Sequence, residues 1–426
     1  MKRIENCFDS HVHWRATGDF AERISLSDLK TPKDILKKEV PAGGPWILGY
    51  GWKFSAEELS QCSRVLLDQW CAETPVALSM SDGHSLWVNT RALEEAGLMK
   101  ETSFSEELCP VDEKGKPLGL LKEAARDHVL KSLPRPNTAV MVRQLMKAQK
   151  IFHDQGITHI RDVHMTSAQW GAAKHLEDSG LLKLAVEAFV FDEALSVSER
   201  VALAKSLRTE PSNLLRLKGV KIFLDGSLGS DTAAVSVQPH PEARLRYSLP
   251  ELEQTLREIW SEGLEVAVHC IGDVASARAC QAALNVQQEG LFGRIHFEHV
   301  EILQDETIHK MKELDGVCHL QPGHWLDDKA WLESKIGTEL VKKSFPWRRL
   351  QEASIPFFFG SDSPLSLPGV ERIRRAVEDA AQNGIPRLLG DAETFLSHPD
   401  LSWPSNTFSE FEGAQLKTSV FKSESL

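Results

Sequence analysis

The stretches LEVAVHCIGD (264–273) and RIHFEHVE (294–301) each carry a run of apolar and β-branched residues, and a histidine stands near the end of each run. Short runs of this composition are typical of buried strands in a parallel sheet. The segment before the first stretch, LPELEQTLREIWSEG (249–263), has the apolar spacing of a helix, with Pro250 suited to the first turn. Strand and helix patterns that alternate in this way predict a parallel sheet built from βα units.

Six further segments have the pattern of short strands, and from about residue 139 onward helical periodicity separates them. They are FDSHVHW (8–14), GITHIRDV (156–163), LKLAVEAFVF (182–191), LKGVKIFLDG (217–226), GVCHLQPG (316–323) and IPFFFGSD (355–362). Eight strands with intervening helices predict an α/β fold, a (β/α)8 TIM-type barrel. An open doubly wound sheet is disfavoured because no glycine fingerprint follows the first strand.

One long segment, 20–135, interrupts the repeat and predicts a large insertion after the first strand. It is too long for a loop and contains both a Gly/Pro-rich stretch at 40–52 and its own candidate strand, PVALSMSDGHSLWVNT (75–90). Because it leaves the carboxyl end of a strand, we expect a subdomain over the active-site face. The expected organisation is 1–19 for the first strand, 20–135 for the insert, 136–385 for the rest of the barrel and 386–426 for a tail that packs outside or frays.

Composition narrows the class of partner. The formal charge is −12, and no block of Lys and Arg stands out. The sequence therefore lacks the basic patch with which proteins bind nucleic acid or anionic lipid. No apolar run reaches the about 18 residues of a membrane span, and the N-terminus lacks a signal-peptide pattern. The 7 cysteines are scattered and never spaced as CxxC, which argues against a disulfide framework and a zinc knuckle. We expect a cytoplasmic protein that acts on a small molecule, with assembly into a homo-oligomer left open.

Six residues near the ends of predicted strands form a candidate metal cage. Two of them are spaced two apart on one strand, so their imidazoles share a face and can converge on one ion. A lone HxH is weak support, but polar groups at the carboxyl ends of several barrel strands are where catalytic groups lie. Satisfied core residues are the alternative; histidine and carboxylate sets of this kind favour a divalent metal. The six are His11, His13, Lys221, His269, His299 and Asp362.

Lys221 needs a separate explanation because an ammonium group cannot bind a metal. If burial depresses its pKa, the free amine can capture carbon dioxide, and the carbamate oxygens can bridge two ions. The alternative is an ordinary lysine paired with Asp225, four residues further along the strand. The two alternatives decide between one metal and two.

The linked motifs HVH, VKIFLDGSLGS, VAVHCIGD, FEHVE, QPGH and FGSDSP, in this order, resemble the amidohydrolase superfamily. More narrowly they resemble its amidohydrolase-3 branch, which contains N-substituted formamide deformylase. Two stretches of the insert, SDGHSLWVNTRAL (81–93) and GLLKEAA (119–125), are also similar to that branch. The resemblance runs from about residue 8 to residue 376.

The resemblance implies one or two divalent metals, most simply zinc, held by the six residues named above. It implies hydrolysis of an amide or related C–N bond of a small molecule by metal-activated water, with Asp362 as general base and then general acid. His84, Gln321 and His324 are candidates for orienting the substrate, or else solvated loop residues.

Two departures from the family pattern are visible. Its flanking segments usually build a small β-sandwich, which we expect to be missing or vestigial here because only seven residues precede FDSHVHW. The stretch GSLGSDTA (226–233) has Asp231 where the branch usually has arginine. The alternatives are therefore another metal-assisted hydrolysis or isomerisation on the same barrel, or a non-catalytic metal-binding relative.

Overall fold

The computed structural model describes residues 2–41, 44–80, 85–100, 104–400, 402–403, 407–412 and 415–420. The chain divides into two compact units, one made of Met1–Gly18 with Thr138–Leu426 and the other of Asp19–Asn137. The first unit contains the predicted barrel.

Eight parallel strands form the core of this unit, in the order β14-β13-β12-β11-β10-β9-β8-β2. The two ends of the sheet meet after β14, where Ser363 bridges Val12 and its carbonyl accepts a hydrogen bond from the His13 N–H at 2.9 Å. The result is a nearly closed TIM-type barrel, which confirms the predicted fold. The strands are β2 (Phe8–Val12), β8 (His159–Met165), β9 (Ala185–Val190), β10 (Leu215–Phe223), β11 (Glu265–Cys270), β12 (Ile295–His299), β13 (Gly316–Leu320) and β14 (Phe357–Phe359).

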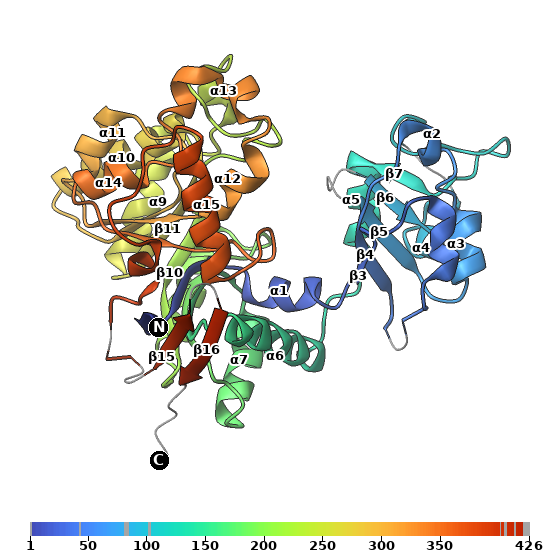
Figure 1. Cartoon of the computed structure of the whole chain (residues 1–426), viewed down its shortest axis with the longest axis horizontal. Coiled ribbons are helices and arrows are strands. Elements are labelled where there is room, and N and C mark those ends of the chain that lie inside the picture. The colour runs from blue at the N-terminus through green and yellow to red at the C-terminus, as the bar shows by residue number, and fades with distance from the viewer. Residues whose placement is uncertain are drawn as a thin grey trace. The chain divides into compact units, whose positions relative to one another are not determined.

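Amphipathic helices cover the outside of the strands (Figure 1). In α9, for example, Leu252, Leu256 and Ile259 recur at helical spacing and are all buried. None of the helices in the described part of the chain is both long and apolar enough to cross a membrane. The helices of this unit are α1 (Trp14–Phe20), α6 (Thr138–Asp154), α7 (Ser167–Asp178), α8 (Val197–Arg208), α9 (Leu249–Ser261), α10 (Asp273–Gln288), α11 (Asp305–Met311), α12 (Pro322–Asp328), α13 (Leu332–Val341), α14 (Trp347–Glu352) and α15 (Val370–Gln382), with 3-10 turns η2 (Pro241–Arg244) and η3 (Ala392–Leu396).

Strand β10 contains a bulge that only glycine allows. Its pairing with β9 shifts register between Leu217 and Gly219, and a Cβ at Gly219 would lie 1.7 Å from the carbonyl oxygen of Glu265 on β11. Backbone atoms of a central strand cannot move aside cheaply. This close approach sets the position of the rest of β10, including Lys221.

We predict that Gly219→Ala destabilises the protein by about 1–3 kcal/mol through overpacking against β11. The matched control is Gly171→Ala in the exposed part of α7, where no atom lies within 4 Å of the added Cβ. There the same methyl group should be neutral or stabilise by up to about 1 kcal/mol, because alanine restricts the unfolded chain. Chemical denaturation of both variants measures the difference, and equal stabilities would contradict this account of β10.

The second unit is a small α/β domain with a five-stranded sheet in the order β3-β4-β5-β6-β7. The single strand predicted over 75–90 is wrong in part: Val76–Met80 and Ser85–Val88 are two strands that pair antiparallel, and residues 81–84 between them lie outside the described residues. Its elements are β3 (Ile24–Ser25), η1 (Pro32–Lys37), β4 (Ile47–Trp52), α2 (Ala56–Leu59), α3 (Arg64–Trp70), β5, β6, α4 (Thr90–Glu95), β7 (Leu120–Lys122) and α5 (Glu123–Lys131).

A three-stranded antiparallel sheet joins the two ends of the chain, in the order β1-β15-β16. It consists of β1 (Lys2–Glu5), β15 (Phe408–Glu412) and β16 (Gln415–Val420), and the last two lie side by side in Figure 1. This small sheet stands in place of a full sandwich, as the sequence predicted. The strands themselves were not expected in the tail, because β16 alternates polar and apolar residues too weakly to stand out.

The chain before β15 is fastened to the barrel by a buried histidine. His159, the first residue of β8, donates from Nε2 to the carbonyl of Trp403 at 2.6 Å, while its Nδ1 lies 2.8 Å from the Thr158 hydroxyl. Burial, with the charge of neighbouring His398, lowers the pKa of His159 from 6.5 to about 3. The folded protein therefore holds this imidazole neutral.

This histidine should make stability fall in mild acid. Above pH 6.5 it is neutral in both states, and as the pH falls towards 3 the unfolded chain binds a proton that the folded chain excludes. Between pH 7 and pH 5 we expect wild type to lose about 2 kcal/mol more stability than His159→Gln, whose amide still reaches Trp403. Denaturation curves at both pH values provide the measurement; identical losses would contradict the assignment.

Candidate metal centre

The carboxyl ends of the barrel strands bring five polar side chains together. His11 on β2 and His13 just after it both approach Asp362, with Nε2 to Oδ1 distances of 3.5 and 3.1 Å. The ring of His299 lies 4.7 Å from that of His11 and 4.5 Å from that of His269. Donor atoms of His11, His299 and Asp362 all lie within 4.8 Å of one another, close enough to share one ion. The sequence predicted this convergence from strand ends alone.

Three of these histidines have a tautomer fixed by an acceptor behind the ring. His11 Nδ1 donates to Glu298 at 2.6 Å, His299 Nδ1 to the Gln321 side-chain oxygen at 2.9 Å, and His269 Nε2 to the Gly226 carbonyl at 2.9 Å. Because the donating nitrogen of each neutral ring keeps its hydrogen, the other nitrogen carries a lone pair. Outer hydrogen bonds of this kind orient metal-binding histidines in proteins. The donor set therefore fits a divalent metal.

The protonation of these rings agrees with that role. Burial, followed by the charge of Lys221, lowers the pKa of His269 to about 3. Burial is also the main cause that lowers the pKa of His11, to about 4. Neutral imidazole is the form that binds metals. Burial alone would raise the pKa of Asp362, but nearby His11, His13 and His324 hold it well below its ordinary value. The aspartate is therefore ionised.

Behind His11 lies a fully buried ion pair that the sequence analysis missed. Glu298 Oε1 lies 2.8 Å from Nη2 of Arg161, and both side chains are wholly inaccessible to solvent. Although burial would raise the pKa of Glu298, Arg161 leads the charges that keep it well below its usual value. Strand alternation hid Glu298, because His299 beside it was taken as the inward residue. In fact the backbone of His299 has a φ of 73°, which ends β12. Strand alternation therefore does not continue there, and the side chains of both Glu298 and His299 reach His11.

Lys221 is buried on β10 and is not paired with Asp225, so the simpler alternative is wrong. Asp225 instead accepts hydrogen bonds from the backbone N–H groups of Ala234, Ile271 and Gly272 at 2.9 to 3.0 Å. Among the described residues the Lys221 ammonium has no hydrogen-bond partner. Burial lowers its pKa from 10.5 to about 8. About a tenth of the amine is thus uncharged and nucleophilic at pH 7, far more than for an exposed lysine.

Two of the three predicted substrate-binding residues reach the site. Gln321 holds His299, as described above. His324 on α12 lies between two carboxylates, with Nδ1 2.8 Å from Glu301 and Nε2 3.5 Å from Asp362. Burial would lower the pKa of His324, but these two carboxylates raise it well above its ordinary value. The third residue, His84, lies outside the described residues.

His164 also belongs to the mouth of the barrel and was missed. Its ring lies 5.6 Å from that of His13. Burial, then the charge of His13, lowers its pKa to about 3. The predicted strand ended at residue 163, whereas β8 continues to Met165. A longer strand estimate would have placed this histidine beside the others.

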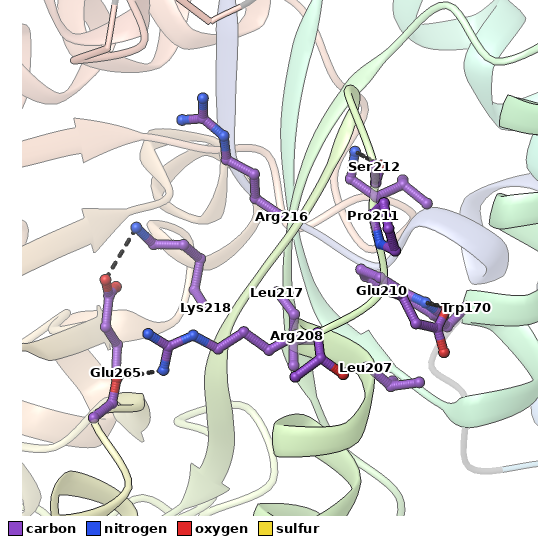
Figure 2. Close-up of a pocket in the computed structure, with 13 residues that line it drawn as sticks. Trp170, Leu207, Arg208, Glu210, Pro211, Ser212, Arg216, Leu217, Lys218 and Glu265 are labelled. Carbon is purple, nitrogen blue, oxygen red and sulfur yellow. Dashed lines mark hydrogen bonds and ion pairs between the residues drawn. The ribbon is translucent and has the colours of Figure 1, made fainter.

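A pocket of 460 Å³ lies at the opposite, amino-terminal ends of β10 and β11 (Figure 2). Several of its polar groups are already paired: Lys218 pairs with Glu265 at 3.0 Å, and Trp170 donates to Glu210 at 2.8 Å. It has no histidine among its lining residues. The cluster at the carboxyl ends is therefore the better candidate for chemistry.

Residues 8–394 match the sequence profile of the Amidohydrolase family. The chain belongs to this family. Among its relatives, this amidohydrolase is 26% identical over 398 residues to the Bacillus subtilis (strain 168) protein named "Putative amidohydrolase YtcJ", covering 88% of this chain and 74% of that protein. It is 28% identical over 411 residues to the Arabidopsis thaliana protein LONG AFTER FAR-RED 3, covering 88% and 68%.

Solved structures of metal-dependent hydrolases share the fold of this amidohydrolase. An uncharacterized metal-dependent hydrolase from Pyrococcus horikoshii OT3 superimposes with a TM-score of 0.74 at 25% identity, covering 90% of this chain and 76% of that one. A second, from Pyrococcus furiosus, gives 0.73 at 25% identity, covering 89% and 76%. Together with the buried His/His/Asp cluster, these similarities identify a metal-dependent hydrolase of the amidohydrolase family.

The unusual Asp231 of this amidohydrolase has a local partner. Its carboxylate pairs with the ammonium of Lys335 on α13 at 3.0 Å. The same ammonium donates to the carbonyls of Leu228 and Gly229. Asp231 therefore helps to hold the loop after β10 against α13, and its charge is compensated there.

Removing the Arg161 guanidinium, which pairs with Glu298 behind His11, should lower the stability of the fold. We predict that Arg161→Met destabilises the protein by about 3–5 kcal/mol, because it leaves the carboxylate of Glu298 buried and unpaired. The matched control is Arg257→Met on α9, whose exposed pair with Glu289 should contribute at most about 1 kcal/mol. Denaturant titration of both variants measures the two losses, and a small effect at Arg161 would show that Glu298 is protonated instead.

Proposed function

We propose that this protein hydrolyses an amide or related C–N bond of a small molecule, with a divalent metal, most simply zinc, bound at the barrel mouth. The observation that carries the proposal is the trio of histidines whose tautomers are fixed by Glu298, Gln321 and Gly226. Donor atoms of two of these rings, His11 and His299, lie within 4.8 Å of a carboxylate oxygen of the ionised Asp362, and the His269 ring packs against His299. A metal bound there would supply a Lewis acid that polarises a carbonyl and acidifies a water.

The chain's own residues supply proton handling at this site. Asp362 is ionised and buried, so its carboxylate is available to accept a proton from water and to return it to a leaving nitrogen. His324 is held protonated beside it by Glu301 and can hold a substrate oxygen or keep Asp362 in position. Glu298 keeps the His11 ring fixed while charge at the site changes.

Lys221 is proposed to carry carbon dioxide as a carbamate. The neutral amine attacks carbon dioxide, one N–H proton leaves to solvent, and an anionic N-carboxylate remains. Support comes from the buried position of Lys221, its lowered pKa and its lack of a hydrogen-bond partner among the described residues. The additional oxygen ligands would make two bound ions more favourable than one.

The function is tested by metal analysis and turnover together. Purified wild type should contain zinc and hydrolyse members of a panel of N-formyl and N-acyl amines, while His11→Ala should lose metal and Asp362→Asn should lose activity by about 100-fold or more. His175→Ala, on α7 away from the strand ends, is the control and should match wild type. When metal-depleted protein is titrated with zinc, added bicarbonate should raise the number of zinc ions that wild type binds. It should not raise the number that Lys221→Ala binds. Full activity in metal-free protein would overturn the proposal.

Product analysis separates the alternatives. Ester or phosphoester hydrolysis or isomerisation on the same barrel would give turnover with a different product. A non-catalytic metal-binding relative would bind zinc tightly, turn over no member of the panel and retain a protein partner in pull-downs.

A further inference from the structure

A wall of aromatic rings connects the candidate metal centre to one side of the barrel mouth. Phe223, the last residue of β10, stacks on His269 with ring centroids 4.8 Å apart. Phe191, which follows β9, packs against Phe223 at 4.9 Å. Both rings stand at the carboxyl ends of their strands, so groups placed over them lie on the same face of the barrel as the candidate metal centre.

Two arginines lie over these rings. The guanidinium of Arg200 on α8 is 4.6 Å from the Phe191 ring centroid, and that of Arg246 is 5.5 Å from the Phe223 centroid. The backbone N–H of Arg246 donates to the Leu224 carbonyl at 2.9 Å, which ties its loop to the exit of β10. Arg246 is thus one aromatic ring away from His269, and Arg200 is two rings away.

The two positive charges are not neutralised locally. Among the described residues, neither arginine has a carboxylate within 4 Å, and Arg200 uses only Nε, which donates to the Asp192 carbonyl at 2.9 Å. The nearby carboxylates have other hydrogen-bond partners. Asp192 accepts from the Ala194 N–H at 3.0 Å, and Glu251 accepts from the hydroxyl and the N–H of Ser248 at 2.7 and 2.8 Å. The remaining guanidinium N–H groups are available to an anion.

We propose that Arg200 and Arg246 bind an anionic group of the substrate, a carboxylate or a phosphate, on the side of the scissile bond facing β9 and β10. The inference rests on the proposed function and narrows it from small amides in general to N-acyl compounds that carry a negative charge. Guanidinium groups bind such oxyanions through paired N–H donors, and stacking on an aromatic ring holds their planes in place.

The experiment compares compounds that differ only in this charge: N-acetylalanine, its phosphonate analogue and its primary amide. Calorimetric titration of the metal-loaded protein measures binding, and the amine product measures turnover. Wild type should bind at least one anion about tenfold more tightly than the amide, the value of one charge-assisted hydrogen bond. Arg200→Gln and Arg246→Gln should each remove about that factor for the anion and leave amide binding unchanged.

Arg257→Gln is the matched control, because it removes the same charge from the outer face of α9, where Arg257 pairs with Glu289. It should leave the preference for the anion intact. Equal binding of anions and amide by wild type, or equal losses in all three variants, would overturn the proposal. Anion-selective binding without hydrolysis of any compound would support the arginine site and count against the proposed hydrolase function, so the two failures are distinct. A preference confined to the carboxylate or to the phosphonate would identify the anion.

Discussion

The barrel is organised around one carboxylate that has no access to water. Glu298 is fully buried between Arg161 and His11, at 2.8 and 2.6 Å. Removing both charges from water costs several kcal/mol per ion, and the arrangement is stable only if every partner stays in place. Arg161 is held in turn over the ring of Phe189, 4.1 Å from its centroid. The ion pair therefore fixes the relative positions of β2, β8 and β12.

That constraint extends directly to the candidate metal centre. Because the Nδ1–H of His11 donates to Glu298, the neutral ring carries its lone pair on Nε2, which faces Asp362. His299 and Asp362 complete the cluster only by adopting left-handed backbone conformations, with φ of 73° and 58°. Such conformations cost about 1–3 kcal/mol each and persist where the surrounding structure enforces them. Here the strained conformations place the side chains of His299 and Asp362, two candidate ligands, at strand ends. Regular strand alternation would turn one of the two away from the candidate metal centre.

The charges around the mouth are arranged unequally. Arg200 and Arg246 stand beside β9 and β10, whereas Glu301 lies on the side of α12, 2.8 Å from the Nδ1 of His324. His324 remains protonated between Glu301 and Asp362. A mouth with opposite charges on its two sides can orient a polar substrate before any bond is broken. This division comes from loops after different strands and not from any single motif.

Much of this organisation could be predicted from the sequence. The apolar runs of the eight strands are long enough, and regular enough in their spacing, to predict the barrel. Residues such as His269 and Asp362 stand at the ends of those runs, which predicts the metal cage by local rules. The large segment after the first strand exceeds any ordinary loop, so its separation as a unit is also evident.

Other features depend on tertiary contacts that no local pattern encodes. The pairing of Glu298 with Arg161 joins positions 137 residues apart, and both look like ordinary strand residues in the sequence. The terminal strands β1, β15 and β16 are short, and only their mutual pairing makes them a sheet. The sequence alone predicted the eight barrel strands and the candidate ligands at their ends, because burial and strand period are local properties. Only the tertiary structure decided which ring nitrogen carries a lone pair, whether Lys221 has a partner and where positive charge remains free, because these depend on distances between separate strands.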